Sequence, residues 1–487
     1  RVRQNKSRAG DQPVNYVSTR GAAPVLSFDD VLVTGLARDG GLYVPAVWPE
    51  FSPAEIGSWK NLSYEDLAFH IIAPFVGNVC PDNELKEIIA SAYSHFDATE
   101  IAPIIGLGDG EWIMELFHGP TLAFKDIAMQ FLGPMFERTL RVRGQRICIV
   151  GATSGDTGSA AIEACRDREN IEAFILYPHG RVSAVQRKQM TTVVAPNIQT
   201  IALQGSFDDC QDIVKALFND LPFRDRMNLS AVNSINWARI VAQIVYYFWA
   251  ALKVGGPETP VSFAVPTGNF GNVFAGYAAY KMGLPINQFF IGSNSNDILT
   301  RFFESGTMAI NDVIPTLSPS MDIQISSNFE RLLFELYGRN GDSVAATLSA
   351  FRKDGRFTVE NSVLQEACKI FRGERYTDEE TLGLMASHYK ATGKLLDPHT
   401  AVGLAVGRQC HKDKSCPIVT LATAHPAKFP AAVEMATDTS PMLPKHISGL
   451  FNREEHINLI DNDIALVKDF IESKAKSGAN NGWGAAL

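Results

Sequence analysis

The chain has 487 residues, 46% hydrophobic and 20% charged, which is typical of a globular protein with more than one domain. Its formal net charge of -9 argues against a nucleic-acid partner and against a general affinity for anionic membranes. The richest apolar stretch, residues 240–254, is interrupted by Gln243 and Lys253 and is too short to span a bilayer. The seven cysteines are scattered without a CxxC pair, which indicates a reducing compartment, the cytoplasm.

The first hundred residues predict a smaller, helix-rich N-terminal section. The opening stretch is basic but lacks the apolar core of a signal peptide. A turn at residues 39–41 is followed by Pro-rich and amphipathic helical segments. We expect this section to occupy residues 1–100.

A lysine lies in the next apolar stretch, HGPTLAFKDIAMQFL, which runs from His118 to Leu132. Between Leu122 and Leu132 the only other strongly polar residues are Asp126 and Gln130. Lys125 could rest its stem on apolar surface and keep its ammonium group in water. Alternatively, it could be a partly buried amine used for chemistry.

Two segments show the order strand, small-residue turn, helix, which is the unit of a parallel α/β sheet. The first has a strand at 147–150, a turn at 151–158 and a helix from 159, and the second has these elements at 261–265, 266–272 and 273–282. Residues 173–177 and 418–422 are two more buried strands by the same criteria. Because open α/β sheets bind ligands at the carboxyl ends of their strands, we expect three site loops to converge there, the third at residues 423–425.

Both glycine-rich turns can hold an anion at the start of the following helix. TGNFGN at 267–272 suits a phosphate, and SGDTGS at 154–159 suits a carboxylate or a phosphate, although small residues also simply permit tight turns. Neither turn has the GxGxxG spacing of a dinucleotide fold, and there is no P-loop motif. Two anion pockets and one lysine fit pyridoxal phosphate, whose aldehyde a lysine holds as a Schiff base, together with an amino-acid substrate.

With these features, the chain resembles the threonine synthase family, pyridoxal-phosphate enzymes of fold type II, the tryptophan synthase β-like family. Seven motifs carry the resemblance, and they span nearly the whole chain in family order. They are YVSTRG at 16, GLARDGGLYVP at 35, HGPTLAFKD at 118, GATSGDTGSAA at 151, NSINWAR at 233, PTGNFGN at 266 and LATAHPAKF at 421. The length and the long N-terminal section resemble the long bacterial and fungal subgroup. The resemblance implies two α/β domains with parallel sheets, which follow the N-terminal section in the sequence. The expected domains are a large cofactor-binding one at 101–130 and 233–487 and a small one at 131–232 with the SGDTG loop.

The resemblance also implies roles for individual residues. Lys125 would bind the cofactor covalently, and Thr423 would face the pyridine nitrogen. The cofactor phosphate would be bound by Gly268, Asn269, Phe270, Gly271 and Asn272. The substrate would be bound by Ser154, Asp156, Thr157, Asn233, Ser234 and Arg239, the last three at its phosphate. Asp156 is expected to orient backbone donors because its charge would repel a carboxylate. His118, Arg20, His425 and Lys428 are weaker candidates.

The implied reaction converts O-phospho-L-homoserine and water to L-threonine and phosphate, in the cytoplasm, by a monomer or homodimer with no metal ion. One alternative is a related enzyme such as a threonine dehydratase, which would share the lysine and the phosphate loop but not NSINWAR. A second is a phospho-lyase that eliminates phosphate without forming threonine. A third is a binding protein that kept the fold, but such a protein would be expected to have lost Lys125.

Overall fold

A computed structural model describes residues 14–153, 155–231 and 233–475, which form two compact units. Unit 1 comprises the described residues of Arg1–His118 and Ser234–Ser440, and unit 2 those of Gly119–Asn233 and Pro441–Leu487. These bounds differ from the domain bounds expected from the sequence at three places, since 119–130, Asn233 and 441–475 belong to unit 2. The domain assignment by function stays a prediction.

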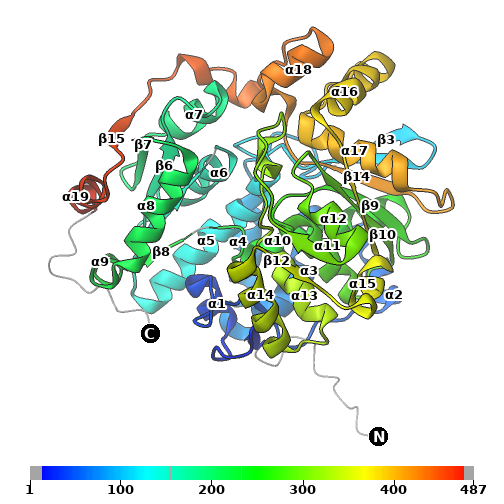
Figure 1. The fold of residues 1–487 in the computed structure, drawn as a ribbon, viewed down its shortest axis with the longest axis horizontal. Helices are drawn as coiled ribbons and strands as arrows, with labels where there is room; N and C mark the ends of the chain where they lie inside the picture. The colour runs from blue at the N-terminus through cyan, green and yellow to red at the C-terminus, as the bar shows by residue number, and fades with distance from the viewer. Residues whose placement is uncertain (1–13, 154, 232, 476–487) are drawn as a thin grey trace, which may run out of the picture. The chain divides into compact units, whose positions relative to one another are not determined.

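Unit 1 is built on a six-stranded sheet in the order β13-β10-β9-β14-β4-β3 (Figure 1). All neighbours in it are parallel except β3 and β4. Its strands are β3 (Ile104–Gly108), β4 (Glu111–Glu115), β9 (Val261–Pro266), β10 (Ile286–Ser293), β13 (Phe371–Arg375) and β14 (Ile418–Ala422). Two antiparallel pairs complete the strands of this unit: β1 (Tyr16–Ser18) with β2 (Tyr43–Pro45), and β11 (Thr307–Ala309) with β12 (Arg356–Thr358).

Helix α10 (Trp237–Val254) forms the interior of unit 1, because every residue from Trp237 to Leu252 is buried. A helix that is buried on all sides is expected inside a large core. It packs against α3 and α11, while α17 crosses β9, β10 and β14. The other helices are α1 (Phe28–Thr34), α2 (Pro53–Ser58), α3 (Tyr64–Val76), α4 (Asp82–Tyr93), α11 (Gly271–Lys281), α12 (Ile298–Ser305), α13 (Phe329–Leu336), α14 (Gly341–Asp354), α15 (Asn361–Cys368), α16 (Asp378–Thr392), α17 (Pro398–Cys410) and α18 (Pro430–Thr437), with 3-10 turns at Gly77–Val79, Pro319–Met321 and Pro426–Lys428.

Unit 2 has a fully parallel sheet in the order β15-β7-β6-β5-β8. Its strands are β5 (Ile147–Ala152), β6 (Ile171–Pro178), β7 (Ile198–Gln204), β8 (Leu229–Ser230) and β15 (Asn458–Asp461). Its helices are α5 (Lys125–Arg143), α6 (Asp156–Cys165), α7 (Ala184–Thr191), α8 (Phe207–Asn219), α9 (Leu221–Met227) and α19 (Ile464–Lys474), with 3-10 turns at Lys445–Ile447 and Leu450–Asn452. In Figure 1 the red β15 lies beside the green β7 at the edge of this sheet.

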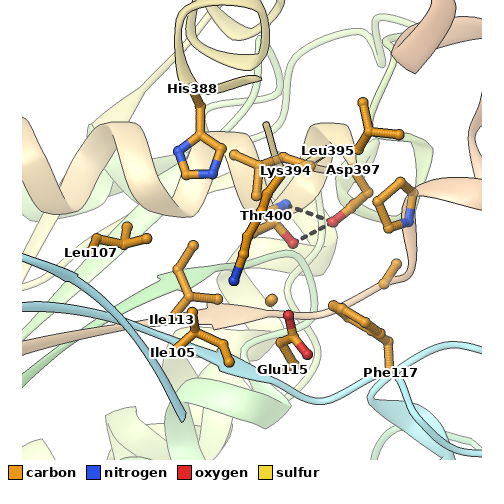
Figure 2. Close-up of a pocket in the computed structure, with 14 residues that line it drawn as sticks. Ile105, Leu107, Ile113, Glu115, Phe117, His388, Lys394, Leu395, Asp397 and Thr400 are labelled. Atoms are coloured by element: carbon orange, nitrogen blue, oxygen red, sulfur yellow. Dashed lines mark hydrogen bonds between the residues drawn. The ribbon is translucent and has the colours of Figure 1, made fainter. Parts of the chain in front are cut away.

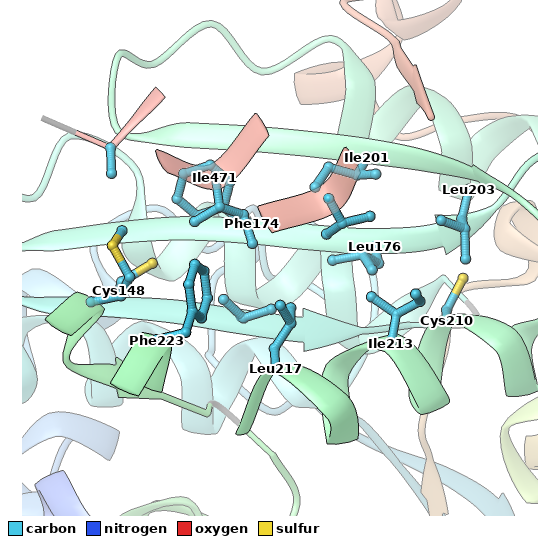
Figure 3. Packing of buried hydrophobic residues seen from close by; sticks show 14 residues of the cluster. Cys148, Phe174, Leu176, Ile201, Leu203, Cys210, Ile213, Leu217, Phe223 and Ile471 are labelled. Carbon is cyan, nitrogen blue, oxygen red and sulfur yellow. The ribbon is translucent and has the colours of Figure 1, made fainter. Parts of the chain in front are cut away.

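The core of unit 2 joins segments from both ends of its sequence. Figure 3 shows Phe174 and Leu176 of β6 packed with Leu217 of α8 and Ile471 of α19. Val467 and Ile471 of α19 are fully buried in this cluster. The C-terminal segment is therefore part of the core of unit 2 and explains why 441–475 belongs there.

The strands expected from the sequence are present, but two helices begin earlier than expected. Helix α6 begins at Asp156 rather than at 159, and α11 begins at Gly271 rather than at 273. Polar and glycine residues are poor helix formers in mid-helix but suit a first turn, where backbone N–H groups lack intrahelical partners. None of the helices in the described ranges is long and apolar enough to cross a membrane.

Candidate active site

Lys125 is the first residue of α5 in unit 2, and a tight turn fixes its position. Asp126 is completely buried and accepts hydrogen bonds from the backbone N of Thr121 at 2.8 Å and from its Oγ1 at 2.6 Å. Leu122, within this turn, adopts a φ of 63°. The Lys125 side chain is only 13% exposed. It is therefore largely buried, which favours the buried-amine interpretation over a lysine extended into water.

Asp156 faces Lys125 within unit 2, with 3.6 Å between its Oδ2 and Nζ. Its Oδ1 accepts a hydrogen bond from Nε2 of Gln186 in α7 at 3.0 Å. Two of the loop's backbone N–H groups are held by Thr153, whose Oγ1 accepts from Gly155 and Gly158 at 2.9 Å each. From the sequence we predicted that Asp156 orients the backbone donors of this loop, and we did not identify Thr153.

Thr157 and Ser154 are the other two substrate-binding residues expected in this loop. Thr157 is the second residue of α6 and is half-buried. Ser154 lies outside the described residues. Gly155 precedes the helix with a φ of 141°, a conformation that L-amino acids with side chains rarely adopt.

In unit 1, the TGNFGN loop connects β9 to α11. Phe270 adopts a φ of 62° and lets the chain turn into the helix at Gly271. The carbonyl of Gly268 accepts a hydrogen bond from Ser326 Oγ at 2.7 Å, and that of Asn269 accepts from the backbone N of Asn328 at 3.0 Å. The carbonyls of Gly268 and Asn269 are thus hydrogen-bonded within the protein. The N–H groups in the first turn of a helix lack intrahelical partners, so those of α11 can bind an anion.

Asn272 presents an amide group at the start of α11. Its Oδ1 lies 2.6 Å from the hydroxyl of Tyr246 and 3.0 Å from that of Tyr247, both on α10. Its Nδ2 is buried and has no hydrogen-bond partner among the described residues. A buried donor without a partner is costly, so this group fits a site completed by a ligand oxygen.

Arg239 lies in the first turn of α10 and is 3% exposed. Its Nε and Nη1 have no hydrogen-bond partner among the described residues. Burial lowers the pKa of its guanidinium to about 10, and nearby Tyr246 raises it slightly, so the group stays charged at neutral pH. A buried cation with two unused donors matches the anion-binding role expected of it.

Ser234 is connected to the TGNFGN loop through the segment 326–328. Its Oγ lies 3.4 Å from Ser327 Oγ, which in turn is 3.4 Å from Asn269 Oδ1. Its carbonyl accepts a hydrogen bond from Asn328 Nδ2 at 3.0 Å. Asn233, the preceding residue, is exposed and belongs to unit 2.

Thr423 follows β14, the strand beside β9, and is 6% exposed. The parallel register pairs Thr420 with Ala264, and continuing it places Thr423 level with Thr267, at the start of the TGNFGN loop. Two of the three expected loops therefore meet at the carboxyl edge of one sheet. The third does not belong to that sheet, because β5 is part of the sheet of unit 2.

A small apolar pocket of about 30 Å³ lies next to Thr423. Figure 2 shows Asp397 bonded to Thr400, with Ile105 and Ile113 on one side and Phe117 on another. Ala422 and Ala424 line the pocket. Since neighbouring residues of an extended chain point in opposite directions, Thr423 points away from it.

The weaker candidates have partners of their own. His118 Nε2 lies 2.7 Å from Glu115 Oε2, and the Arg20 guanidinium forms a two-point ion pair with Glu330 at 3.0 and 2.9 Å. His425 Nδ1 accepts the backbone N–H of Ala427. Lys428 is completely buried.

The chain's own residues fit pyridoxal phosphate on two structural observations. The unused Nδ2 of Asn272 and the start of α11 are donors suited to a phosphate. A Cβ atom at Gly268 would lie 2.9 Å from the Ser320 carbonyl oxygen, so the loop has no room for a side chain there. Lys125 supplies the buried amine that an aldehyde requires.

Several residues of these sites were missed in the sequence. Four residues outside the TGNFGN loop bond to it: Ser326, Asn328, Tyr246 and Tyr247. Arg331, completely buried, donates to Asn328 Oδ1 and to the carbonyl of Ile235. The polar run SSNFER at 326–331, which leads into α13, was a usable signal. The two tyrosines gave none, because they lie in a segment that is apolar throughout.

Comparisons with known proteins match the chain to one family. Residues 15–93 match the family model for the threonine synthase N terminus, residues 97–423 that for pyridoxal-phosphate dependent enzymes and residues 400–471 that for the threonine synthase C-terminal region. The chain is 52% identical to threonine synthase of Pseudomonas aeruginosa, over 96% of this chain and 99% of that protein. It is 43% identical to threonine synthase of Saccharomyces cerevisiae, over 94% and 98%.

Solved structures give the same result for the fold. PLP-bound threonine synthase from Brucella melitensis superposes with a TM-score of 0.94 at 48% identity, covering 95% of this chain and all of that one. The fold-type-II architecture of two α/β units with parallel sheets is thereby confirmed. The chain belongs to the threonine synthase family of pyridoxal-phosphate-dependent enzymes.

Proposed function

We propose that the chain catalyses the conversion of O-phospho-L-homoserine and water to L-threonine and phosphate, the last step of threonine biosynthesis. The observation that carries the proposal is Arg239, a buried cation with two unused donors in the NSINWAR motif. A cofactor with one phosphate needs only the TGNFGN loop. A second anion site on this chain is what a phosphorylated substrate requires.

The predicted site residues would bind different parts of the cofactor and the substrate. Gly268, Asn269, Phe270, Gly271 and Asn272 would hold the cofactor phosphate, and Thr423 would contact its pyridine nitrogen. Bound to Lys125, the cofactor supplies an electron sink that stabilises negative charge on the substrate's α-carbon. The loop from Ser154 through Asp156 and Thr157 would bind the substrate carboxylate.

Lys125 and Arg239 would act on the reacting groups. The free amine of Lys125 would take the proton from the substrate's Cα and return protons along the substrate chain. Asp156, 3.6 Å away, holds its ammonium form in place. Arg239, with Asn233 and Ser234, would bind the γ-phosphate and stabilise it as it leaves.

A Lys125→Ala variant tests the assignment of the amine. Threonine formation from O-phospho-L-homoserine should fall to background, and the visible absorption band of the lysine-bound cofactor should be lost. Lys125→Arg should fail equally, because a guanidinium does not form an imine at working pH. Turnover near that of the wild type in either variant would contradict the proposal.

A product assay separates the proposed reaction from its relatives. Wild-type enzyme should release phosphate and threonine in equal amounts. Phosphate without threonine would identify a phospho-lyase instead. A monomeric or homodimeric state and a cytoplasmic location are part of the proposal, the latter supported by seven free cysteines, five of them buried.

A further inference from the structure

Unit 1 contains a second, larger cavity of about 440 Å³, which we name the α14 pocket. Residues of the N-terminal section, the β11–β12 pair, α13 and α14 surround it. Helix α14 contacts both α13 and β12, and the three elements lie together in Figure 1. None of the thirteen residues assigned to the active site lines it.

The wall of the α14 pocket is predominantly apolar. Eleven of its seventeen lining residues are Leu, Ile, Met or Phe. Leu36, Ile310 and Ile325 among them remain 46%, 42% and 60% exposed. A volume of this size with apolar walls and a few polar groups is typical of a small-molecule site, and exposed apolar side chains around it would be covered by a ligand.

The polar groups of the pocket carry an excess of positive charge. Arg20 and Arg352 both approach Gly40: their Nη1 and Nη2 atoms lie 2.8 and 3.8 Å from the position of a Cβ there. The one acid in the wall, Glu330, is already bonded by both ends of the Arg20 fork and by Thr19 Oγ1 at 2.6 Å. Arg352 is exposed at the rim and forms no ion pair or hydrogen bond with any described residue.

We infer that the α14 pocket binds a small molecule that combines an apolar body with a carboxylate, the carboxylate facing Arg352. The inference does not rest on the proposed reaction. The pocket also shares a wall with the cofactor loop, since Ser326 and Ser327, which line it, bond to Gly268 and Asn269. A ligand there would therefore contact the residues that support the phosphate loop.

Three probes of equal length test the chemistry of the site. The holoenzyme is titrated calorimetrically with 4-phenylbutyrate, 4-phenylbutanol and 4-phenylbutylamine. The carboxylate should bind about tenfold more tightly than the alcohol, which corresponds to one charge-assisted hydrogen bond, and the amine should bind most weakly. Equal affinities for the three probes, or no binding of the carboxylate, would overturn the inference.

Variants locate the bound probe. Arg352→Gln should weaken 4-phenylbutyrate binding about tenfold, whereas Lys353→Gln, the same charge change at the same helix end but outside the pocket, should leave it unchanged. Leu348→Trp should fill the pocket and abolish binding. Ile325→Trp, at a 60% exposed position, repeats the obstruction without disturbing the core. Unaltered affinity in a folded Trp variant would place the probe elsewhere and overturn the inference.

Discussion

The ammonium nitrogen of Lys125 lies 3.6 Å from Oδ2 of Asp156, and Gln186 holds the other carboxylate oxygen at 3.0 Å. Both side chains are largely buried, at 13% and 7% exposure. An opposite charge at this distance stabilises the protonated amine. The acid of the SGDTG loop therefore contacts both the lysine and Gln186 of α7.

Asp156→Asn removes the charge but keeps a group that can bond to Gln186. Without the carboxylate the protonated form of Lys125 is less stable, so loading of the apoenzyme with pyridoxal phosphate should shift to lower pH. The loading rate, followed by absorbance between pH 6 and 9, measures this shift. Asp167→Asn, an exposed acid of the same unit, serves as the control, and an unshifted profile in the Asp156 variant would contradict the interaction.

Gly268→Ala should weaken cofactor retention more than Gly271→Ala. The added Cβ at Gly268 meets the backbone carbonyl oxygen of Ser320 at 2.9 Å, whereas at Gly271 it meets the side-chain nitrogen of Asn328 at 3.2 Å, a milder contact with a side chain rather than with backbone. Overpacking against backbone costs about 1–3 kcal/mol. Dialysis against cofactor-free buffer compares retention, with Gly383→Ala as a control because nothing lies within 4 Å of its Cβ. If Gly268→Ala and Gly271→Ala retain the cofactor equally well, this result would argue against the loop as the phosphate site.

Arg239→Met should lower activity without lowering stability. Losing a buried charge-assisted contact to the substrate phosphate costs about 2–5 kcal/mol, which is roughly 30- to several-thousand-fold in kcat/KM for O-phospho-L-homoserine. Affinity for vinylglycine, which carries no phosphate, should change little. In phosphate-free buffer the variant should melt no lower than the wild type, because the buried guanidinium has unused donors. A large fall in melting temperature would mean that Arg239 is structural.

Glu455→Gln should destabilise unit 2 at neutral pH but not in acid. Arg187, Thr191 and Lys188 bond to Glu455 and lower its pKa to about 2 from an ordinary 4.5. A carboxylate with a lowered pKa in the folded state stabilises the fold above pH 4.5 and loses this effect as the pH falls towards 2.

Urea unfolding at several pH values tests this sign. The wild type should exceed the variant by about 1 kcal/mol at pH 7, with the difference shrinking below pH 4.5. Glu454→Gln, the exposed neighbour, should show no such dependence. A difference that stays constant down to pH 3 would contradict the role of the Glu455 charge.

The strands and loops of the site could be predicted because they depend on local patterns. Strand β14 runs from Ile418 to Ala422 as expected, and the small-residue turns follow buried β-branched runs. What the sequence could not reveal depends on contacts between distant segments. Tyr246 reaches Asn272, and Ser326 reaches Gly268 over 58 positions, and neither pairing leaves a periodic signal.

The return of the C-terminal segment to unit 2 has a consequence for how the chain folds during synthesis. Strand β15 pairs with β7, and Asn458 bonds to Thr200 across 258 positions. Until the ribosome has released this segment, β7 is an open sheet edge, and the cluster that receives Val467 and Ile471 is incomplete. Closing so long a loop is entropically costly, so unit 2 should mature last although most of its sequence is translated before the main part of unit 1.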